Sequence, residues 1–296
     1  MLRRIRITNY KSFNDLELAL TPVCVIFGPN SSGKSNFLDA IYLLSRFVTA
    51  KNLKEAFEGH RGLPLESFCY ADTGYDGLLR RPDVQMSFEV DVELSDTVCR
   101  TVNKVITEKR KERKGSGVPE VEKRAVTERY LRYQLAIEGL PATGHLRVTN
   151  ERLTALRRNG EEKRRKPFLE RVQREGHDMI HLRMEGQARP TYYEVGLDHT
   201  VVSTPLYEPH YPHITAFRME LENWQVFYLE PKVLMREEVP LAEVGRIGPR
   251  GENLAAFLNT LKHENQAAFE DFGLTLKTIL PTASKVDVEL FKEGRV

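Results

Sequence analysis

Alternation of apolar and polar side chains predicts β-strands at several points along the chain. The clearest run is 84–94, where Val84, Met86 and Phe88 begin a series of apolar residues at every second position. Shorter runs predict strands at 2–8, 16–20, 23–27, 130–137, 145–150, 179–184, 192–195, 223–229 and 284–291. Short strands that follow one another through turns pair antiparallel, so most of these segments predict a β-meander.

Helical spacing of apolar residues appears in other parts of the chain. It predicts a helix over 34–47, another over 210–222, and two helices within 248–280 near the C-terminal end. Residues 48–83 carry scattered glycines and prolines and predict loops with short helical pieces. The chain is therefore expected to be of the α/β class.

One short motif connects the apolar run 23–27 to the first of these helices, and its letters are GPNSSGKS. Its spacing, Gly28-x-x-x-x-Gly33-Lys34-Ser35, is that of a P-loop in the strand–turn–helix context that such a motif requires. The glycines let backbone N–H groups surround a phosphate, and the helix N-terminus directs its positive end to the same anion. An ordinary glycine-rich turn is the alternative, and a chance match of this kind is rare because glycine makes up only about 7% of average proteins.

The residues before the P-loop add a second pattern. RRIRITNYKSFNDLELAL is followed by IFGPNSSGKSNFLDAI, which is a strand, an Asn-aromatic-Lys-Ser-Phe turn, a second strand and the P-loop. This opening, residues 1–47, resembles the RecF/SMC/OLD-type branch of ABC-class ATPases. Residues 223–280 look like predicted bacterial ATPases of the AAA-21 type. The resemblance implies a P-loop NTPase fold, an ABC/SMC-head-like nucleotide-binding lobe with an antiparallel β-meander and a helical segment near the C-terminus.

The motif and the resemblance together predict ATP and Mg²⁺ as cofactors. Lys34 can reach the β- and γ-phosphates and is the expected catalytic lysine, and the Ser35 hydroxyl can ligand Mg²⁺. Gln225 is a second expected Mg²⁺ ligand, with an ordinary polar strand residue as the alternative. The expected nucleotide-contacting residues are Lys11, Ser12, Gly28, Pro29, Asn30, Ser31, Ser32, Gly33, Lys34, Ser35 and Asn36.

ABC-class hydrolysis also needs an apolar strand that ends in Asp-Glu and a Ser-Gly-type signature at a helix N-terminus. After residue 40 the sequence contains no run of four apolar residues followed by Asp-Glu. We therefore expect residues 1–231 to form the nucleotide-binding lobe, with charged insertions near 103–125 and 157–175. Residues 232–296 are expected to form a helical segment and the start of an incomplete second lobe. The lack of these catalytic motifs has three possible explanations: a truncation, a split gene or a natural nucleotide-binding subunit.

Composition limits the cellular compartment and the kinds of partner that the chain can have. The 296 residues are 41% hydrophobic and 29% charged, with a net charge of +2. Three cysteines without metal-binding spacing fit a reducing cytoplasm, and no apolar run approaches the roughly 18 residues of a membrane span. The basic runs 109–114 and 157–174 can contact DNA phosphates, and solvated surfaces explain them equally well.

These features predict the ATP-binding lobe of a RecF/SMC/OLD-like ATPase. ATP-dependent dimerisation would regulate a DNA transaction, either repair or anti-phage defence. The expected partners are a second copy, a partner ATPase half or an effector subunit, with DNA possible and no membrane. One alternative is a non-hydrolysing ATP-sensing scaffold subunit. Another is an unrelated P-loop kinase or GTPase, and the lack of an Asn-Lys-x-Asp motif in the sequence stands against a GTPase.

Overall fold

The computed structural model of the protein describes residues 1–70, 72–114, 125–185, 190–291 and 294–295. The chain divides into two compact units, Met1–Trp224 and Gln225–Val296. Each unit is described by itself below. The sequence had placed the division seven residues later, after residue 231.

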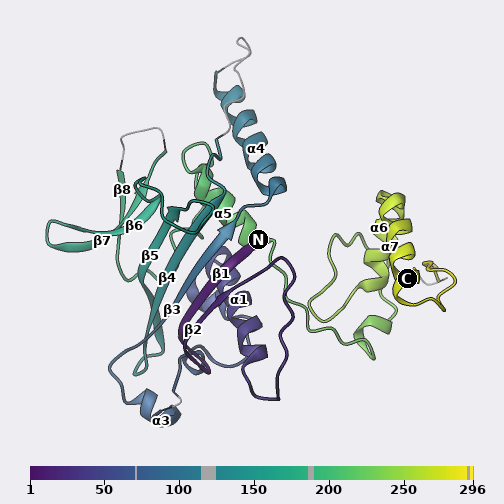
Figure 1. The fold of residues 1–296 in the computed structure, drawn as a ribbon, viewed down its shortest axis with the longest axis horizontal. Coiled ribbons are helices and arrows are strands. Elements are labelled where there is room, and N and C mark those ends of the chain that lie inside the picture. The colour runs from purple at the N-terminus through teal and green to yellow at the C-terminus, as the bar shows by residue number, and fades with distance from the viewer. Residues whose placement is uncertain (71, 115–124, 186–189, 292–293, 296) are drawn as a thin grey trace. The chain divides into compact units, whose positions relative to one another are not determined.

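An antiparallel sheet of eight strands, counted over the described residues, forms the frame of the first unit (Figure 1). The strands lie in the order β2-β1-β3-β4-β5-β6-β7-β8, and every neighbouring pair runs antiparallel. The predicted α/β class with an antiparallel sheet is therefore confirmed. The strands are β1 (Leu2–Tyr10), β2 (Phe13–Ala19), β3 (Val84–Glu93), β4 (Tyr130–Leu140), β5 (His145–Ala155), β6 (Leu169–Arg174), β7 (His177–Arg183) and β8 (Pro190–Glu194).

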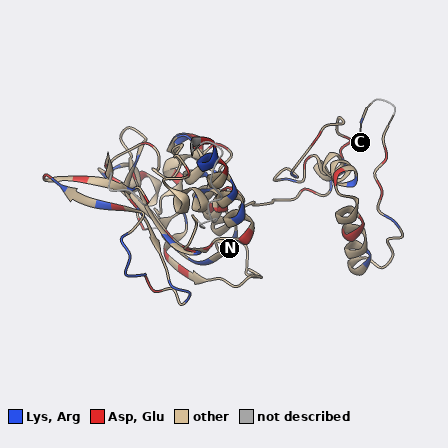
Figure 2. Ribbon diagram, turned by 90° about the horizontal axis from the view of Figure 1, so that it is seen from above, with Lys and Arg blue, Asp and Glu red and all other residues tan. Residues whose placement is uncertain are grey.

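The two faces of the sheet differ because side chains alternate along each strand. On β3 the apolar side chains Val84, Met86 and Phe88 are buried. The polar residues between them, Gln85 and Ser87, point to the other face of the sheet, where Arg132 of β4 binds the largely buried carboxylate of Asp91 at 2.6 Å. Figure 2 shows acidic and basic residues interspersed along the strands. Opposite charges on neighbouring strands stabilise the register of this outer face.

Helices cover the apolar face of the sheet in the first unit (Figure 1). The Ser45 hydroxyl of α1 donates a hydrogen bond to the Leu221 carbonyl of α5 at 2.7 Å, which ties these two helices together. Phe47 of α1 packs on Phe88 of β3 with ring centroids 6.0 Å apart. The described helices of the first unit are α1 (Lys34–Thr49), α2 (Leu53–Ala56), α3 (Gly74–Leu79), α4 (Asp96–Lys114) and α5 (Pro212–Glu222), with the 3₁₀ helix η1 (Pro64–Ser67).

The second unit contains the two helices predicted near the C-terminal end, α6 (Leu254–Glu264) and α7 (Gln266–Ile279), and the 3₁₀ helix η2 (Leu234–Arg236). The Asn265 side chain lies between α6 and α7 and accepts a hydrogen bond from the Ala268 N–H at 3.1 Å. This N-cap satisfies one of the free N–H groups of α7 and separates the two helices. Within the described residues, no helix is both long and apolar enough to cross a membrane.

Three predicted strands are wrong. Residues 23–27, 223–229 and 284–291 adopt no regular strand. In the first of them Phe27 is 90% exposed, and Cys24 is exposed as well. An apolar run forms a strand only when a neighbouring strand satisfies its N–H and C=O groups, and no described strand pairs with these segments.

The opposite error concerns β6, which lies inside the segment that the sequence predicted to be a basic insertion. Its residues include Glu170, Arg171 and Arg174, and these charged side chains interrupt the alternation of apolar and polar residues that would predict a strand. The strand forms because it pairs with β7, and Leu169 at its start is buried. Cross-strand pairing therefore overrides the local composition.

A buried carboxyl group connects the sheet to the helix that follows the P-loop. Glu151 of β5 accepts hydrogen bonds from the N–H groups of Val201 and Val202 at 2.6 and 3.1 Å and from the Tyr133 hydroxyl at 2.8 Å. The adjacent Thr200 hydroxyl donates to the carbonyl of Phe47 in α1 at 2.8 Å. Burial raises the pKa of Glu151 to about 7, although these three donors oppose the shift.

We expect Glu151 to make the protein less stable as the pH rises from about 4.5 to about 7. In this range the unfolded state has lost the proton and the native state keeps it, so the free energy of unfolding falls by up to about 1.4 kcal/mol per pH unit. Urea unfolding of the wild type and of Glu151→Gln at pH 5, 6 and 7 measures the effect. The variant lacks the titrating group, so its pH slope should be shallower, and equal slopes would contradict the assignment.

Candidate nucleotide-binding site

The loop between residues 28 and 33 has the backbone shape that a phosphate cradle requires. Gly28, Ser31 and Gly33 have positive φ angles of 155°, 64° and 92°. Such angles turn successive N–H groups toward a common point, and glycine adopts them at little cost. The predicted contact residues Pro29, Asn30, Ser31 and Ser32 lie exposed on this loop. The first unit therefore presents an open, tightly turned loop.

Helix α1 begins at Lys34, directly after this loop. No side chain caps its N-terminus, and its first turn contains no acidic residue. The N–H groups of the first turn and the positive end of the helix dipole are thus available to an anion. The loop and the helix converge on one site, which fits the phosphate group of a nucleotide.

The Lys34 ammonium group lies over the loop. It donates hydrogen bonds to the carbonyl oxygens of Gly28 and Pro29 at 2.8 and 2.6 Å and lies 3.4 Å from the Ser32 hydroxyl oxygen. These contacts hold the ammonium against the backbone of the loop. A bound phosphate would add its negative charge at the same place, and Lys34 would offset it.

The Asn-aromatic-Lys-Ser-Phe turn packs directly against the P-loop. A Cβ atom added at Gly33 would lie 2.9 Å from the Phe13 ring and 3.1 Å from the Ser12 hydroxyl oxygen. The Ser12 hydroxyl also accepts a hydrogen bond from the Asn36 side-chain amide at 2.9 Å. Residue 33 must therefore be glycine for two reasons, its positive φ angle and this close approach. The contacts bring together Ser12, Gly33 and Asn36, which the sequence singled out.

Lys11 takes part in a cluster that the sequence did not predict. Its ammonium group binds the carboxylate of Asp39 on α1 at 2.8 Å and the Arg61 carbonyl at 3.0 Å. The Arg61 guanidinium binds the same carboxylate at 2.5 to 3.2 Å. Asp39 carried one signal in the sequence, a charge among the apolar residues of the helix. Arg61 carried none, because its segment reaches α1 only through tertiary folding.

A cleft opens next to this cluster, on the side of the first turn of α1. It has a volume of about 420 Å³ and is lined by Lys11, Ser12, Asn36, Arg61, Glu66, Tyr70 and a glycine. Small-molecule sites fall between about 300 and 1,000 Å³, so the cleft is large enough for part of a ligand. It lies beside the P-loop, because Ser12, which lines it, packs against Gly33, and Asn36, which also lines it, directly follows the motif.

The two expected Mg²⁺ ligands lie in different units. Ser35 is the second residue of α1 and its side chain is exposed. Gln225 is the first residue of the second unit. No group of three or more His, Cys, Asp or Glu side chains in the described residues could hold a metal ion. A hydroxyl oxygen such as that of Ser35 suits Mg²⁺, which takes its remaining ligands from phosphates and water. Both roles remain predictions.

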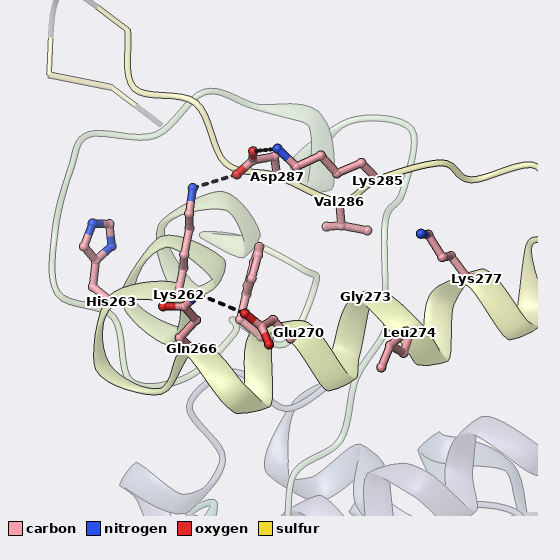
Figure 3. Close-up of a pocket in the computed structure, with 11 residues that line it drawn as sticks. Lys262, His263, Gln266, Glu270, Gly273, Leu274, Lys277, Lys285, Val286 and Asp287 are labelled. Atoms are coloured by element: carbon pink, nitrogen blue, oxygen red, sulfur yellow. Dashed lines mark hydrogen bonds and ion pairs between the residues drawn. The ribbon is translucent and has the colours of Figure 1, made fainter.

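A larger pocket, of about 690 Å³, lies in the second unit (Figure 3). Its wall is formed by α7 and by residues 285–287. At its rim the Asp287 carboxylate binds Lys262 at 2.6 Å and Lys285 at 2.5 Å. The lysines are thus already engaged by a carboxylate, and the pocket contains none of the residues of the P-loop motif. The P-loop motif, where the nucleotide site is predicted, belongs to the first unit.

Internal ion pairs engage several cations of the two basic runs, most of them in 157–174. Lys109 binds Glu208 at 2.6 Å, Lys163 binds Glu128 at 2.5 Å and Arg171 binds Asp178 at 2.5 Å. Within the described residues three exposed cations have no carboxylate partner in the loop between β5 and β6, and these are Arg158, Arg164 and Lys166. This loop, rather than the whole of 157–174, carries the charge that is available to a partner.

Comparison with known proteins agrees with this geometry. Residues 1–123 match the AAA ATPase domain family. The DNA replication and repair protein RecF of Phocaeicola vulgatus is 37% identical to the chain over 94 residues, which is 29% of this chain and 25% of that protein. The N-terminal part of this chain is RecF-like. The resemblance seen in residues 1–47 is confirmed, and the match spans about a quarter of the length of this curated relative.

Residues 1–123 are thus similar to an AAA ATPase domain, a kind of domain that binds nucleotides, and part of the chain is similar to RecF. The family match includes the P-loop, the Asn-aromatic-Lys-Ser-Phe turn and the segment that contains Arg61. The part of the chain that matches the AAA ATPase domain family therefore contains the residues that form the candidate site in the structure.

Proposed function

We propose that this chain is the ATP-binding lobe of a RecF-like ATPase whose ATP-dependent dimerisation regulates a DNA transaction in repair or anti-phage defence. One observation carries the nucleotide part of the proposal. The positive-φ loop, the uncapped N-terminus of α1 and the Lys34 ammonium follow one another within residues 28–34, and each of these features suits an anion. These three features suit a triphosphate better than a single phosphate. Lys34 and a Mg²⁺ ion would contact oxygens of the β- and γ-phosphates, which a single phosphate lacks.

The direct test is a calorimetric titration of the full chain with ATP in the presence of Mg²⁺, with Lys34→Ala as the comparison. Heat of binding in the wild type that the variant loses supports the proposal. Equal affinities would show that ATP binds elsewhere or not at all at the P-loop. Addition of EDTA to the wild type should weaken binding, because the Ser35 hydroxyl would help to hold a Mg²⁺ ion that offsets the charge of the phosphates.

The DNA part of the proposal depends on the loop between β5 and β6. Three exposed cations close together can neutralise phosphates of the DNA backbone and release counterions, without reading the base sequence. The relative RecF is named for DNA replication and repair, which supports DNA as the partner. We therefore expect weak binding that does not depend on the DNA sequence.

Replacement of Arg158, Arg164 and Lys166 with glutamine is expected to weaken DNA binding and to reduce its salt dependence. The slope of log K against log salt should become shallower by about 0.9 for each lost contact with duplex DNA. Anisotropy titrations at several salt concentrations measure this. The control is a triple variant that removes the same charge from another part of the first unit. In it glutamine replaces Lys51, Lys54 and Arg80. An equal loss in both triple variants would contradict a specific role for the loop.

A non-hydrolysing ATP-sensing scaffold is the second candidate. The exposed apolar run 23–27, just before the P-loop, favours it together with the lack of an apolar strand ending in Asp-Glu. Both candidates predict ATP binding by this chain. They differ in whether bound ATP is hydrolysed once the chain has its partners, so a turnover assay in their presence separates them.

A further inference from the structure

Asp39 is a charged residue in an unusual place. It lies on α1, one turn after the P-loop lysine, and its side chain is only 5% exposed. A buried carboxylate lowers stability unless cations or hydrogen bonds compensate it. Several other residues on the same helix face are apolar and buried, so specific contacts must compensate the charge of Asp39.

Two cations supply this compensation. The carboxylate holds Lys11, from the turn between β1 and β2, and Arg61, from the loop after α2, at 2.8 and 2.5 Å. The Lys11 ammonium also binds the Arg61 carbonyl at 3.0 Å. Both long side chains are therefore held in one orientation by hydrogen bonds to charged groups, which are stronger than neutral ones. Two cations share one carboxylate, so the cluster keeps a net positive charge.

This positive cluster forms one wall of the cleft of about 420 Å³ beside the P-loop. The cleft begins at Ser12 and Asn36, which are hydrogen-bonded to each other next to Gly33 of the P-loop, and extends to Arg61, Glu66 and Tyr70. Arg61 is 55% exposed, so its guanidinium is accessible even though Asp39 binds it. A guanidinium plane and a tyrosine ring both stack on planar aromatic ligands.

We propose that Asp39 is a positioning residue for the nucleoside part of the bound ATP, and that it holds Lys11 and Arg61 at the wall of the cleft where the ribose and base lie. The inference rests on the proposed function, since the cleft matters only if the P-loop holds the phosphates. Lys11 then faces the α-phosphate and ribose. Arg61 and Tyr70 face the base.

The test compares two ligands, ATP and inorganic tripolyphosphate, each with Mg²⁺ on the full chain. Tripolyphosphate carries the phosphates without the nucleoside. Asp39→Asn and Arg61→Ala are expected to lower ATP affinity about tenfold or more, the size of a lost hydrogen bond to a charged group. Neither should change the affinity for tripolyphosphate. Arg80→Ala removes another exposed arginine as the matched control, and Lys34→Ala should weaken both ligands.

Each other outcome has a definite meaning. If Asp39→Asn weakens both ligands equally, Asp39 supports only the shape of the P-loop and the inference is wrong. If Arg61→Ala, a change at a half-exposed side chain, leaves ATP affinity unchanged, the cleft does not read the nucleoside and the inference is again wrong. If the wild type binds neither ligand, the proposed function itself fails. Circular dichroism of each variant shows that the fold is retained.

Discussion

Replacing Lys34 with alanine is expected to reduce ATP affinity by roughly 10- to 150-fold, the equivalent of about 1.5–3 kcal/mol for a hydrogen bond to a charged group. The ammonium group lies over the loop, bound to the carbonyls of Gly28 and Pro29. Alanine leaves the backbone N–H groups in place and removes the one flexible cation of the motif. Isothermal titration calorimetry with Mg-ATP measures the change.

Two further variants make this result specific. Lys51→Ala removes one exposed lysine just after α1 and should leave the ATP affinity unchanged. Lys34→Arg keeps the charge but replaces a compact ammonium with a planar fork, so it should recover only part of the affinity. If Lys34→Ala and Lys51→Ala behave alike, the lysine of the P-loop has no special role and the nucleotide site lies elsewhere.

Residues 1–296 alone are expected to bind ATP and to hydrolyse it at or near background. Hydrolysis needs the phosphate cradle with Mg²⁺, a carboxylate that positions the water, and donors to the γ-phosphate. Lys34 and Ser35 supply the cradle. Loss of a general base lowers the rate by about 10²–10⁴-fold, and loss of one γ-phosphate donor by about 10²–10³-fold. A phosphate-release assay on the purified chain measures turnover, with Lys34→Ala as the control for contaminating ATPases.

Several carboxylates that could position the water are already bound by lysine or arginine side chains, which strengthens this expectation. Asp39, the nearest acidic residue on α1, binds Lys11 and Arg61. In the second unit Glu230 binds Arg250 at 2.7 Å. Hydrogen bonds from Lys262 and Lys285 lower the pKa of Asp287, which makes it a poor base.

Turnover of roughly 1 s⁻¹ or faster, within the ordinary range of enzymes, would overturn this prediction if Lys34→Ala abolished it. The positioning carboxylate would then lie within these residues. Glu230, Asp287 and Glu289 would be the first to replace with their amides. A single variant that loses turnover but keeps ATP affinity would identify it.

The elements that the sequence predicted correctly are those that depend on local patterns. Strand β3 alternates apolar and polar residues over its whole length, and β1 and the helix α1 carry equally regular patterns. The P-loop is also local, because its glycines and the helix start determine its shape within eight residues. The Asn-aromatic-Lys-Ser-Phe turn could be placed near it only through the family resemblance, and the contact between Phe13 and Gly33 agrees.

The sequence by itself determined the antiparallel strands with clear alternation, the helix after the P-loop and the phosphate-binding motif, because each arises from residues close together in the chain. Tertiary structure decided whether an apolar run such as 23–27 became a strand, since pairing needs a neighbour from elsewhere in the protein. It also decided the cluster of Lys11, Asp39 and Arg61. These residues are separated by 28 and 22 positions, and no periodic pattern links them. Only folding brings their charges into contact beside the P-loop.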